Sequence, residues 1–172
     1  MSRLTPEEAA IVEVVAEFVD DDVRPVAHDL EHANTYPEQL IEKMKSLGCF
    51  GLAIPEPYGD VATSTACYAL VVEELSRGWM TLGGAIGGHT VVSHLWSWFG
   101  TEEQKQRHLP AMATGATRAT MALTEPGGGS DLQAMTTTAR RDGDHYVVSG
   151  TKMFITNARR SQLMALLCKT DP

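Results

Sequence analysis

The hydrophobic pattern of this chain changes its period near residue 117, and that change divides the fold. Before it, apolar residues recur at spacings of three and four, as they do along one face of an α-helix. After it, short apolar and β-branched segments alternate with turn residues, which is typical of β-strands. We therefore predict a mainly α protein with a C-terminal β part: an all-α helical domain at 1–117, then the beginning of a β domain at 118–172.

Two capping boxes mark the starts of predicted helices. In residues 5–8 and 101–104, a Thr is followed three positions later by Glu or Gln, so the two side chains can satisfy free N–H groups of a first turn. The first box precedes a valine-rich stripe over 12–30, and Pro25 should kink or split that helix because it lacks an N–H donor. The second box begins a helix that runs toward Gly115.

Three more helices are expected between these two. Pro37 begins one that Gly48 ends, and another carries its apolar residues over 68–79. The nearly uncharged stretch 78–101 contains several glycines and two histidines, so a membrane span is disfavoured. We predict instead a helix over about 80–99 that is buried nearly all round.

Strand-like segments fill the rest of the chain. Strands are predicted at 118–123, 152–156 and 163–168, and Asp142-Gly143 should form the turn of a hairpin over 136–148. The last strand has little sequence after it with which to pair. The β part is therefore expected to be incomplete.

Composition excludes several classes of function. The chain has 172 residues, with 14 basic against 22 acidic, and the net charge of −8 disfavours binding to nucleic acid. The N-terminus lacks the basic and apolar blocks of a secretory signal. Cys49, Cys67 and Cys168 are odd in number and form no CxxC pair, which predicts a reduced, cytoplasmic protein.

The segment "MALTEPGGGSDLQAM" (121–135) is the first candidate site. Three consecutive glycines lose much conformational entropy when they become ordered, and their bare N–H groups can hold a phosphate or the edge of a planar polar ring. No Lys-Ser/Thr follows, so it is not a P-loop, and it is not the GxGxxG of a dinucleotide fold. A simple connecting loop is the alternative, and Glu125 is expected to stabilise the turn.

The segment "GTKMFITNA" (150–158) is the second. On a strand, Phe154 and Thr156 would point to the same face, where the ring could stack on a flat heterocycle and the hydroxyl could bond to it. A core Phe beside a surface-facing Thr is the alternative.

Together these two segments resemble the flavin-binding signature of the acyl-CoA dehydrogenases. Other stretches are similar to that family in the same order: "LGCFGLAIPEPYGD", "VVEELSR" and "FGTEEQKQRHLPAMATG". The resemblance implies an N-terminal helical domain, a middle antiparallel β-barrel, here incomplete, and a C-terminal four-helix domain. FAD would lie between the middle and C-terminal domains.

The resemblance also implies roles for individual residues. Three would meet the pyrimidine edge of the flavin through backbone and hydroxyl groups: Met121, Leu123 and Thr124. Gly129 and Ser130 would lie by the FAD pyrophosphate, with Ser130 also near the bound acyl-CoA. Phe154, where many members have Trp, and Thr156 would lie at the flavin face, the Thr hydroxyl close to N5.

The implied activity is an oxidoreductase reaction of fatty acid metabolism. An acyl-CoA thioester would become its 2,3-enoyl-CoA, with hydride transfer to flavin N5 and electrons passing to an electron-transferring flavoprotein. Members are usually tetramers, so a homo-oligomer is implied. The family's general base is a glutamate of the C-terminal domain or the segment before it, so no catalytic base is assigned here and one is expected beyond Pro172. The alternatives are an acyl-CoA oxidase, or a truncated fragment that serves only as an interaction module.

The histidines allow two further interpretations. His28 and His32 are one helical turn apart, but no third ligand is in view, so no metal site is predicted. In the family, the fourth helix and the loop before it help to line the acyl pocket. His89 is therefore a possible neighbour of the substrate, with a hydrogen-bonded core histidine as the alternative.

Overall fold

The computed structural model describes residues 4–59 and 63–170. Asp60, at the end of the predicted loop 50–60, and residues 171–172 of the predicted β domain lie outside that part. The helices are α1 (Pro6–Phe18), a π-helical segment η1 (Val19–Val23), α2 (Arg24–His32), α3 (Glu38–Ser46), α4 (Thr65–Gly78), α5 (Met80–Phe99), α6 (Glu102–Ala113) and a 3₁₀ turn η2 (Leu132–Ala134). The strands are β1 (Ala119–Ala122), β2 (Thr138–Asp142), β3 (His145–Ser149) and β4 (Leu163–Leu166).

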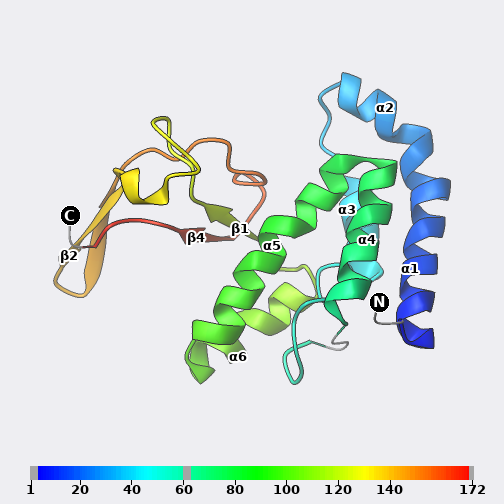
Figure 1. Cartoon of the computed structure of the whole chain (residues 1–172), viewed down its shortest axis with the longest axis horizontal. Helices are drawn as coiled ribbons and strands as arrows, with labels where there is room; N and C mark the ends of the chain where they lie inside the picture. Colours follow the sequence, from blue (N-terminus) through cyan, green and yellow to red (C-terminus); the bar gives the residue numbers. More distant parts are fainter. Residues whose placement is uncertain (1–3, 60–62, 171–172) are drawn as a thin grey trace.

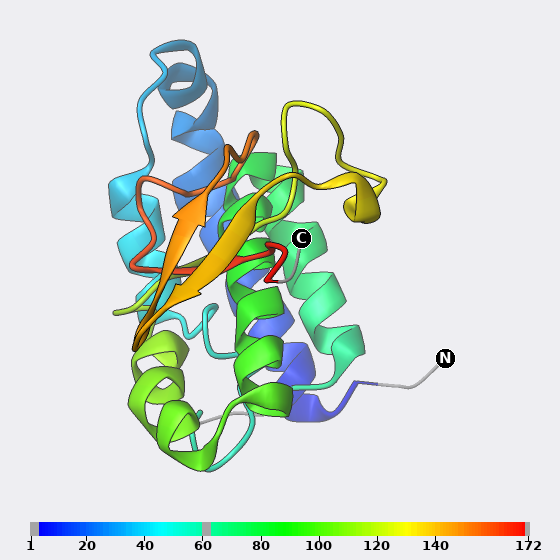
Figure 2. The same cartoon turned by 90° about the vertical axis from the view of Figure 1, so that its left-hand side faces the viewer.

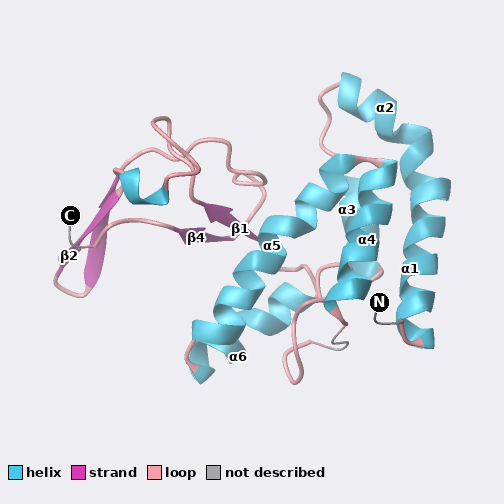
Figure 3. Cartoon of the chain, viewed as in Figure 1, coloured by secondary structure: helices cyan, strands magenta, loops and turns pink. Residues whose placement is uncertain are grey.

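The helices gather at one side of the molecule and the strands at the other (Figures 1 and 3). Helix α1 packs on α4, α4 on α5, and α5 on both α6 and β1. Seen from the side, the β2–β3 hairpin stands in front of α5 (Figure 2). Helix α5 therefore joins the two halves, and the mainly helical architecture with a small C-terminal β part is confirmed.

The first helix breaks where Pro25 predicts. Helix α1 gives way to the π-helical turn η1, and Pro25 then occupies the first turn of α2, where a missing N–H is better tolerated than in a helix interior. Val19 and Val23 of η1 are fully buried. The wider turn thus keeps both valines in the core while the helix accommodates the proline.

Both capping boxes are formed. Thr5 accepts a hydrogen bond from the Glu8 N–H at 3.2 Å, and Glu8 accepts one from the Thr5 N–H at 3.0 Å. The second carboxylate oxygen of Glu8 accepts from the Ser64 N–H at 2.8 Å. Glu8 therefore ties the start of α1 to the cap residue of α4.

The main core lies between α1, α3, α4 and α5. Its central side chains are apolar and almost completely inaccessible to solvent: Val15, Ile41, Met44, Val71, Leu75, Leu82 and Ile86. A second cluster joins α5 and α6 to β1 through Val92, Leu109, Met112 and Ala119. The β part thus rests on α5 and α6.

The prediction that α5 is buried nearly all round is wrong. Its inner face is covered, but Met80 and Phe99 are each 78% exposed and Trp98 is 69% exposed. When apolar residues occur on all sides of a helix, hydropathy alone cannot show which of its faces is buried. Helix α5 therefore presents an apolar surface at both of its ends.

The expected antiparallel β-barrel is not formed within the described residues. Strands β2 and β3 pair antiparallel as the predicted hairpin, from Thr138 opposite Ser149 to Asp142 opposite His145. Strands β1 and β4 instead pair in parallel, with Ala119 opposite Leu163. The two sheets are small and open. One pair is parallel and the other antiparallel, so the β part is mixed in direction rather than wholly antiparallel.

Candidate functional site

The glycine loop begins with a tight two-residue turn. The Glu125 N–H donates to the Gly128 carbonyl at 2.9 Å, and the Gly128 N–H donates to the Glu125 carbonyl at 3.1 Å. Pro126 and Gly127 form the tip. A Cβ placed on Gly127 or on Gly128 would meet no atom of the protein within 4 Å. The glycines are not required by packing inside the chain, and they leave the main chain open to a planar group from outside.

Strand β1 has one paired and one open edge. The Arg118 carbonyl accepts from the Leu163 N–H and the Ala122 carbonyl from the Leu167 N–H, each at 3.1 Å. Main-chain groups alternate in direction along a strand, so these even-numbered positions face β4. The odd-numbered positions of β1, and Leu123 after it, face the opposite edge.

That opposite edge carries both fixed and available groups. At one end the Ala119 N–H donates to His89 Nδ1 at 3.2 Å. At the other, the Leu123 carbonyl accepts from Lys152 Nζ at 2.8 Å. Met121 lies between them, half-buried, with its main chain turned away from β4. A Cβ on Gly88 of α5 would lie 3.8 Å from the Met121 nitrogen, so α5 covers part of this edge. The part that α5 leaves open could bind a polar heterocycle by main-chain hydrogen bonds.

Glu125 anchors the glycine loop to the chain that follows it. One carboxylate oxygen accepts from the Thr136 N–H at 2.6 Å and from the Thr136 hydroxyl at 2.7 Å. The other accepts from the Thr137 N–H at 2.9 Å and from Lys152 Nζ at 3.0 Å. Hydrogen bonds from Thr137 and Thr136 hold the pKa of this carboxyl well below its usual range. Glu125 is therefore a structural anion and is not free to exchange a proton near neutral pH.

The two candidate segments meet in space. The Met153 N–H donates to the Thr124 carbonyl at 2.8 Å, and the Thr120 hydroxyl donates to the Thr156 carbonyl at 2.6 Å. Asn157 also reaches the carbonyls of Gly84 and Ala85 on α5, at 3.4 Å from each. The segment 150–157 is thus fixed against both the glycine loop and α5.

The strand predicted at 152–156 is absent, and the reason given for pairing Phe154 with Thr156 is wrong. Phe154 has a φ of 58° and Asn157 a φ of 62°, so the chain turns where a strand would continue. The Phe154 side chain is 85% exposed, and Thr156 is exposed as well. An uncovered aromatic ring on a left-handed backbone has no role in the described core, and such positions concentrate at functional sites.

The far end of the glycine loop has little spare room on one side. A Cβ on Gly129 would lie 3.3 Å from Thr124 Cγ2, so a larger residue there would press on the Thr124 side chain. Ser130 is exposed. Asp131 then accepts from the Gln133 N–H at 3.1 Å and caps η2. The loop therefore presents the hydroxyl of Ser130 and an unobstructed main chain beside it.

His89 lies in the core and not on the surface. Its side chain is 1% exposed, and its ring meets the Phe50 ring edge-on at 5.2 Å between centroids. Because the Ala119 N–H can only donate, Nδ1 is the unprotonated nitrogen and the neutral ring carries its proton on Nε2. Burial lowers the pKa of His89 to about 4. The hydrogen-bonded core histidine is thus what the structure contains.

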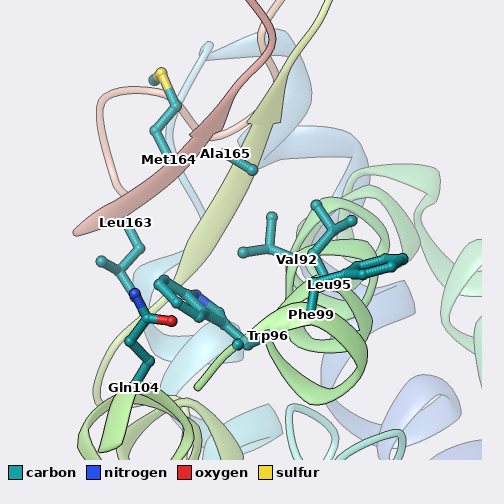
Figure 4. A pocket seen from close by; sticks show the side chains of 9 residues that line it. Val92, Leu95, Trp96, Phe99, Gln104, Leu163, Met164 and Ala165 are labelled. Atoms are coloured by element: carbon teal, nitrogen blue, oxygen red, sulfur yellow. The ribbon is translucent and has the colours of Figure 1, made fainter. Parts of the chain in front are cut away.

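A separate apolar cavity lies between α5, α6 and β4 (Figure 4). It has a volume of about 220 Å³, and its lining includes Trp96, Phe99 and Met164. No ionisable side chain lines it, so it offers no acid, base or metal ligand. None of its lining residues belongs to the glycine loop or to segment 150–157, so it is separate from the candidate site.

The described residues contain neither a cluster of metal ligands nor a membrane-spanning helix. Within residues 4–59 and 63–170, no three His, Cys, Asp or Glu side chains gather as metal ligands. His28 and His32 stack on one another at 4.1 Å between centroids. No helix of the described part is long and apolar enough to cross a membrane.

Sequence reasoning missed Lys152 and the contact between Arg118 and Tyr36. The sequence did contain a signal for Lys152, since it lies inside a predicted strand. A buried lysine in a strand must reach a carboxylate or a carbonyl. Arg118 donates to the Tyr36 hydroxyl at 2.6 Å, and Arg160 stacks over the same ring at 4.5 Å. No local pattern connects residues so distant in sequence.

The fold and the glycine loop define a class of protein, and comparison with known families agrees. Residues 5–116 match the N-terminal domain of acyl-CoA dehydrogenases, and residues 120–172 match the middle domain. The chain belongs to the acyl-CoA dehydrogenase family.

Three relatives illustrate the similarity. The short-chain specific acyl-CoA dehydrogenase of Clostridium acetobutylicum is 35% identical over 98% of this chain and 45% of its own length. A glutaryl-CoA dehydrogenase from Mycobacterium smegmatis in complex with FADH2 superposes with a TM-score of 0.90 at 32% identity, over 98% of this chain and 44% of that one. A chain in a structure of the electron transferring flavoprotein of Acidaminococcus fermentans gives 0.86 at 35% identity, over 94% and 43%. This chain spans less than half the length of each.

Proposed function

We propose that this chain forms the N-terminal part of a FAD-dependent acyl-CoA dehydrogenase, which oxidises an acyl-CoA thioester to its 2,3-enoyl-CoA. One observation carries the proposal. The open main chain from Thr124 to Ser130 is held against segment 150–157 by the hydrogen bond from Met153 to Thr124, at 2.8 Å. Two segments that the flavin signature requires on one side of the molecule are therefore in contact.

The residues present fit a flavin. The open edge of β1 offers main-chain donors and acceptors for the pyrimidine side of the ring, and we assign Met121, Leu123 and Thr124 to that role. Gly129 and Ser130 are assigned to the diphosphate, with Ser130 also beside the acyl-CoA. Phe154 and Thr156 are assigned to the face of the ring, where the exposed aromatic side chain would be covered.

The chain's contribution to the reaction is binding and orientation. Bound FAD would supply the acceptor for the hydride that leaves the substrate β-carbon. The described residues orient the ring and exclude water from one of its edges. Glu125 is committed to its donors, so it is not assigned as the base that takes the α-proton. That base, and the acyl-chain specificity, belong to the whole enzyme.

Several further assignments are proposals of the same kind. Helix α6 ends at Ala113 and β1 begins at Ala119, which supports a domain boundary at 117/118. The similarity to the Acidaminococcus chain supports an electron-transferring flavoprotein as the acceptor. A homo-oligomer, a cytoplasmic location and a substrate contact of His89 stay predictions, and the last would require the buried ring to become accessible.

Titration of FAD into this chain, labelled with ¹⁵N, tests the site. We expect the amide signals of Thr124, Ser130, Phe154 and Thr156 to shift, with a dissociation constant weaker than about 1 µM, because the remaining contacts of the cofactor would come from outside this chain. Micromolar or tighter binding would contradict that division of the site. The chain alone is expected to hold FAD weakly or not at all, so binding whose shifts are confined to α2 and α3 is the result that would disprove the flavin assignment.

A further inference from the structure

We propose that Lys152 and Glu125 are positioning residues for the flavin: Lys152 polarises the Leu123–Thr124 peptide and, with Glu125, fixes it at the start of the glycine loop. This inference rests on the proposed function. It concerns two residues for which no contact with the flavin has been assigned.

The contacts of one ammonium group carry the inference. Lys152 Nζ donates to the Leu123 carbonyl at 2.8 Å and to Glu125 Oε1 at 3.0 Å. The Lys152 side chain is 9% exposed and the Glu125 side chain 5% exposed. A lysine ammonium buried to this extent needs acceptors in place of water, and here a carbonyl and a carboxylate at the start of the glycine loop supply them.

The Leu123 carbonyl and the Thr124 N–H belong to the same peptide group. A cation bonded to a carbonyl draws electron density from the amide, and its N–H becomes a stronger donor. The next peptide is also fixed, because the Thr124 carbonyl accepts from the Met153 N–H. The Leu123–Thr124 peptide is thus held by Lys152 and fixed on its C-terminal side by Met153, at the start of the loop where the flavin is proposed to bind.

Glu125 determines where the lysine can lie. Its carboxylate is itself held by Thr136 and Thr137, so the ion pair is connected to the chain beyond the loop. A purely structural pair would stabilise the fold without altering the affinity for FAD. Buried ion pairs contribute little net stability in many proteins, and this one is bonded to the Leu123 carbonyl at the start of the loop.

The test compares Lys152→Met with Lys105→Met, a matched change on α6 away from the loop, in the ¹⁵N-labelled chain. Without FAD, we expect K152M to move the Thr124 amide proton upfield while the β2–β3 amide signals keep their positions. With FAD, we expect the dissociation constant of K152M to rise about tenfold, as a difference of about 1.4 kcal/mol would give. K105M should match the wild-type chain in both measurements.

The outcomes separate this inference from the proposed function. If FAD shifts Thr124 and Phe154 in the wild-type chain, but K152M keeps its affinity within about twofold and an unmoved Thr124 signal, the inference is overturned and the flavin site stands. If FAD binds but shifts neither residue in any chain, the proposed function fails, and the Thr124 signal without FAD still reports on the polarisation.

A second variant covers the case in which K152M loses the hairpin signals and therefore does not fold. Glu125→Gln keeps the shape of the side chain and the lysine cation but removes the carboxylate that holds it. We expect E125Q to weaken FAD binding and to shift the Thr124 amide. A folded E125Q chain with wild-type affinity would overturn the inference.

Discussion

Two buried ionisable residues, near the two ends of β1, differ in charge. Glu125 stays charged because donors from Thr137, Thr136 and Lys152 replace its water. His89 stays neutral because burial dominates and its ring accepts a single main-chain hydrogen bond. Burial therefore decides the charge of His89, and hydrogen-bond donors decide that of Glu125.

The neutral state of His89 makes stability depend on pH. Its pKa in the folded chain, about 4, lies below the 6.5 of the exposed group, so the unfolded chain binds more protons between those values. The stabilisation is therefore complete above the unfolded pKa and is lost as pH falls through the folded one. Between about pH 7.5 and pH 4, we expect a loss of about 3 kcal/mol from this residue.

His89→Gln isolates that contribution, because Gln keeps an acceptor for the Ala119 N–H but does not titrate. The difference in unfolding free energy between the wild-type chain and H89Q, measured in guanidinium chloride, should decrease as pH falls over this range. A constant difference would show that His89 is not held neutral by the fold.

At the scale of elements, features that depend on neighbouring residues were predicted correctly, and features that depend on contacts distant in sequence were not. The capping boxes, the split at Pro25 and the hairpin at Asp142-Gly143 each depend on a few neighbouring residues, and all three are present. The strand at 152–156 failed because Phe154 takes a left-handed conformation that contacts with Thr124 and α5 impose. Propensity cannot anticipate such tertiary contacts.

The parallel pairing of β1 with β4 could not be predicted either. Strand order and direction depend on how the chain between Leu123 and Gln162 returns, and alternation of apolar residues is the same for both directions. For the site, the two segments that the sequence singled out are in contact, and the roles assigned to their residues stay predictions. The buried Lys152–Glu125 pair that joins them was not, because it spans 27 positions.

The box at the start of α6 permits a direct test of one element. The Thr101 hydroxyl accepts from the Gln104 N–H at 3.3 Å, and Gln104 accepts from the Thr101 N–H at 2.9 Å. Thr101→Ala removes the first bond, so we expect a loss of about 1 kcal/mol in unfolding free energy. Thr101→Ser keeps the hydroxyl and should cost much less. Equal losses in the two variants would show that the cap does not stabilise α6.

At the scale of the whole molecule, apolar surface is left uncovered at the C-terminal end of α5. Trp98 and Phe99 are exposed at its end, and Met164 is 48% exposed on β4, across the cavity of Figure 4. Contiguous apolar patches are uncommon on isolated soluble monomers and mark surfaces that another chain or domain covers. We therefore expect the apolar face formed by Trp98, Phe99 and Met164 to be covered by another chain or domain.

We expect the chain to self-associate through that face as its concentration rises. Multi-angle light scattering at about 100 µM should give an average mass above that of one chain, because the exposed aromatic surface is removed from water on contact. The double variant Trp98→Ser/Phe99→Ser should be closer to monomeric. Val14→Ser, at an exposed apolar position on α1, is the control and should behave as the wild-type chain. Equal masses for all three would contradict the expectation.

The parallel pairing of β1 with β4 has a thermodynamic consequence for whatever the glycine loop binds. Both ends of the span from Leu123 to Gln162 are pinned, one after β1 and one before β4, and this span contains the loop and segment 150–157. The entropy lost on closing it is a cost of folding and not of association. A ligand would thus meet a preorganised frame, and its affinity would not be reduced by the need to order these residues.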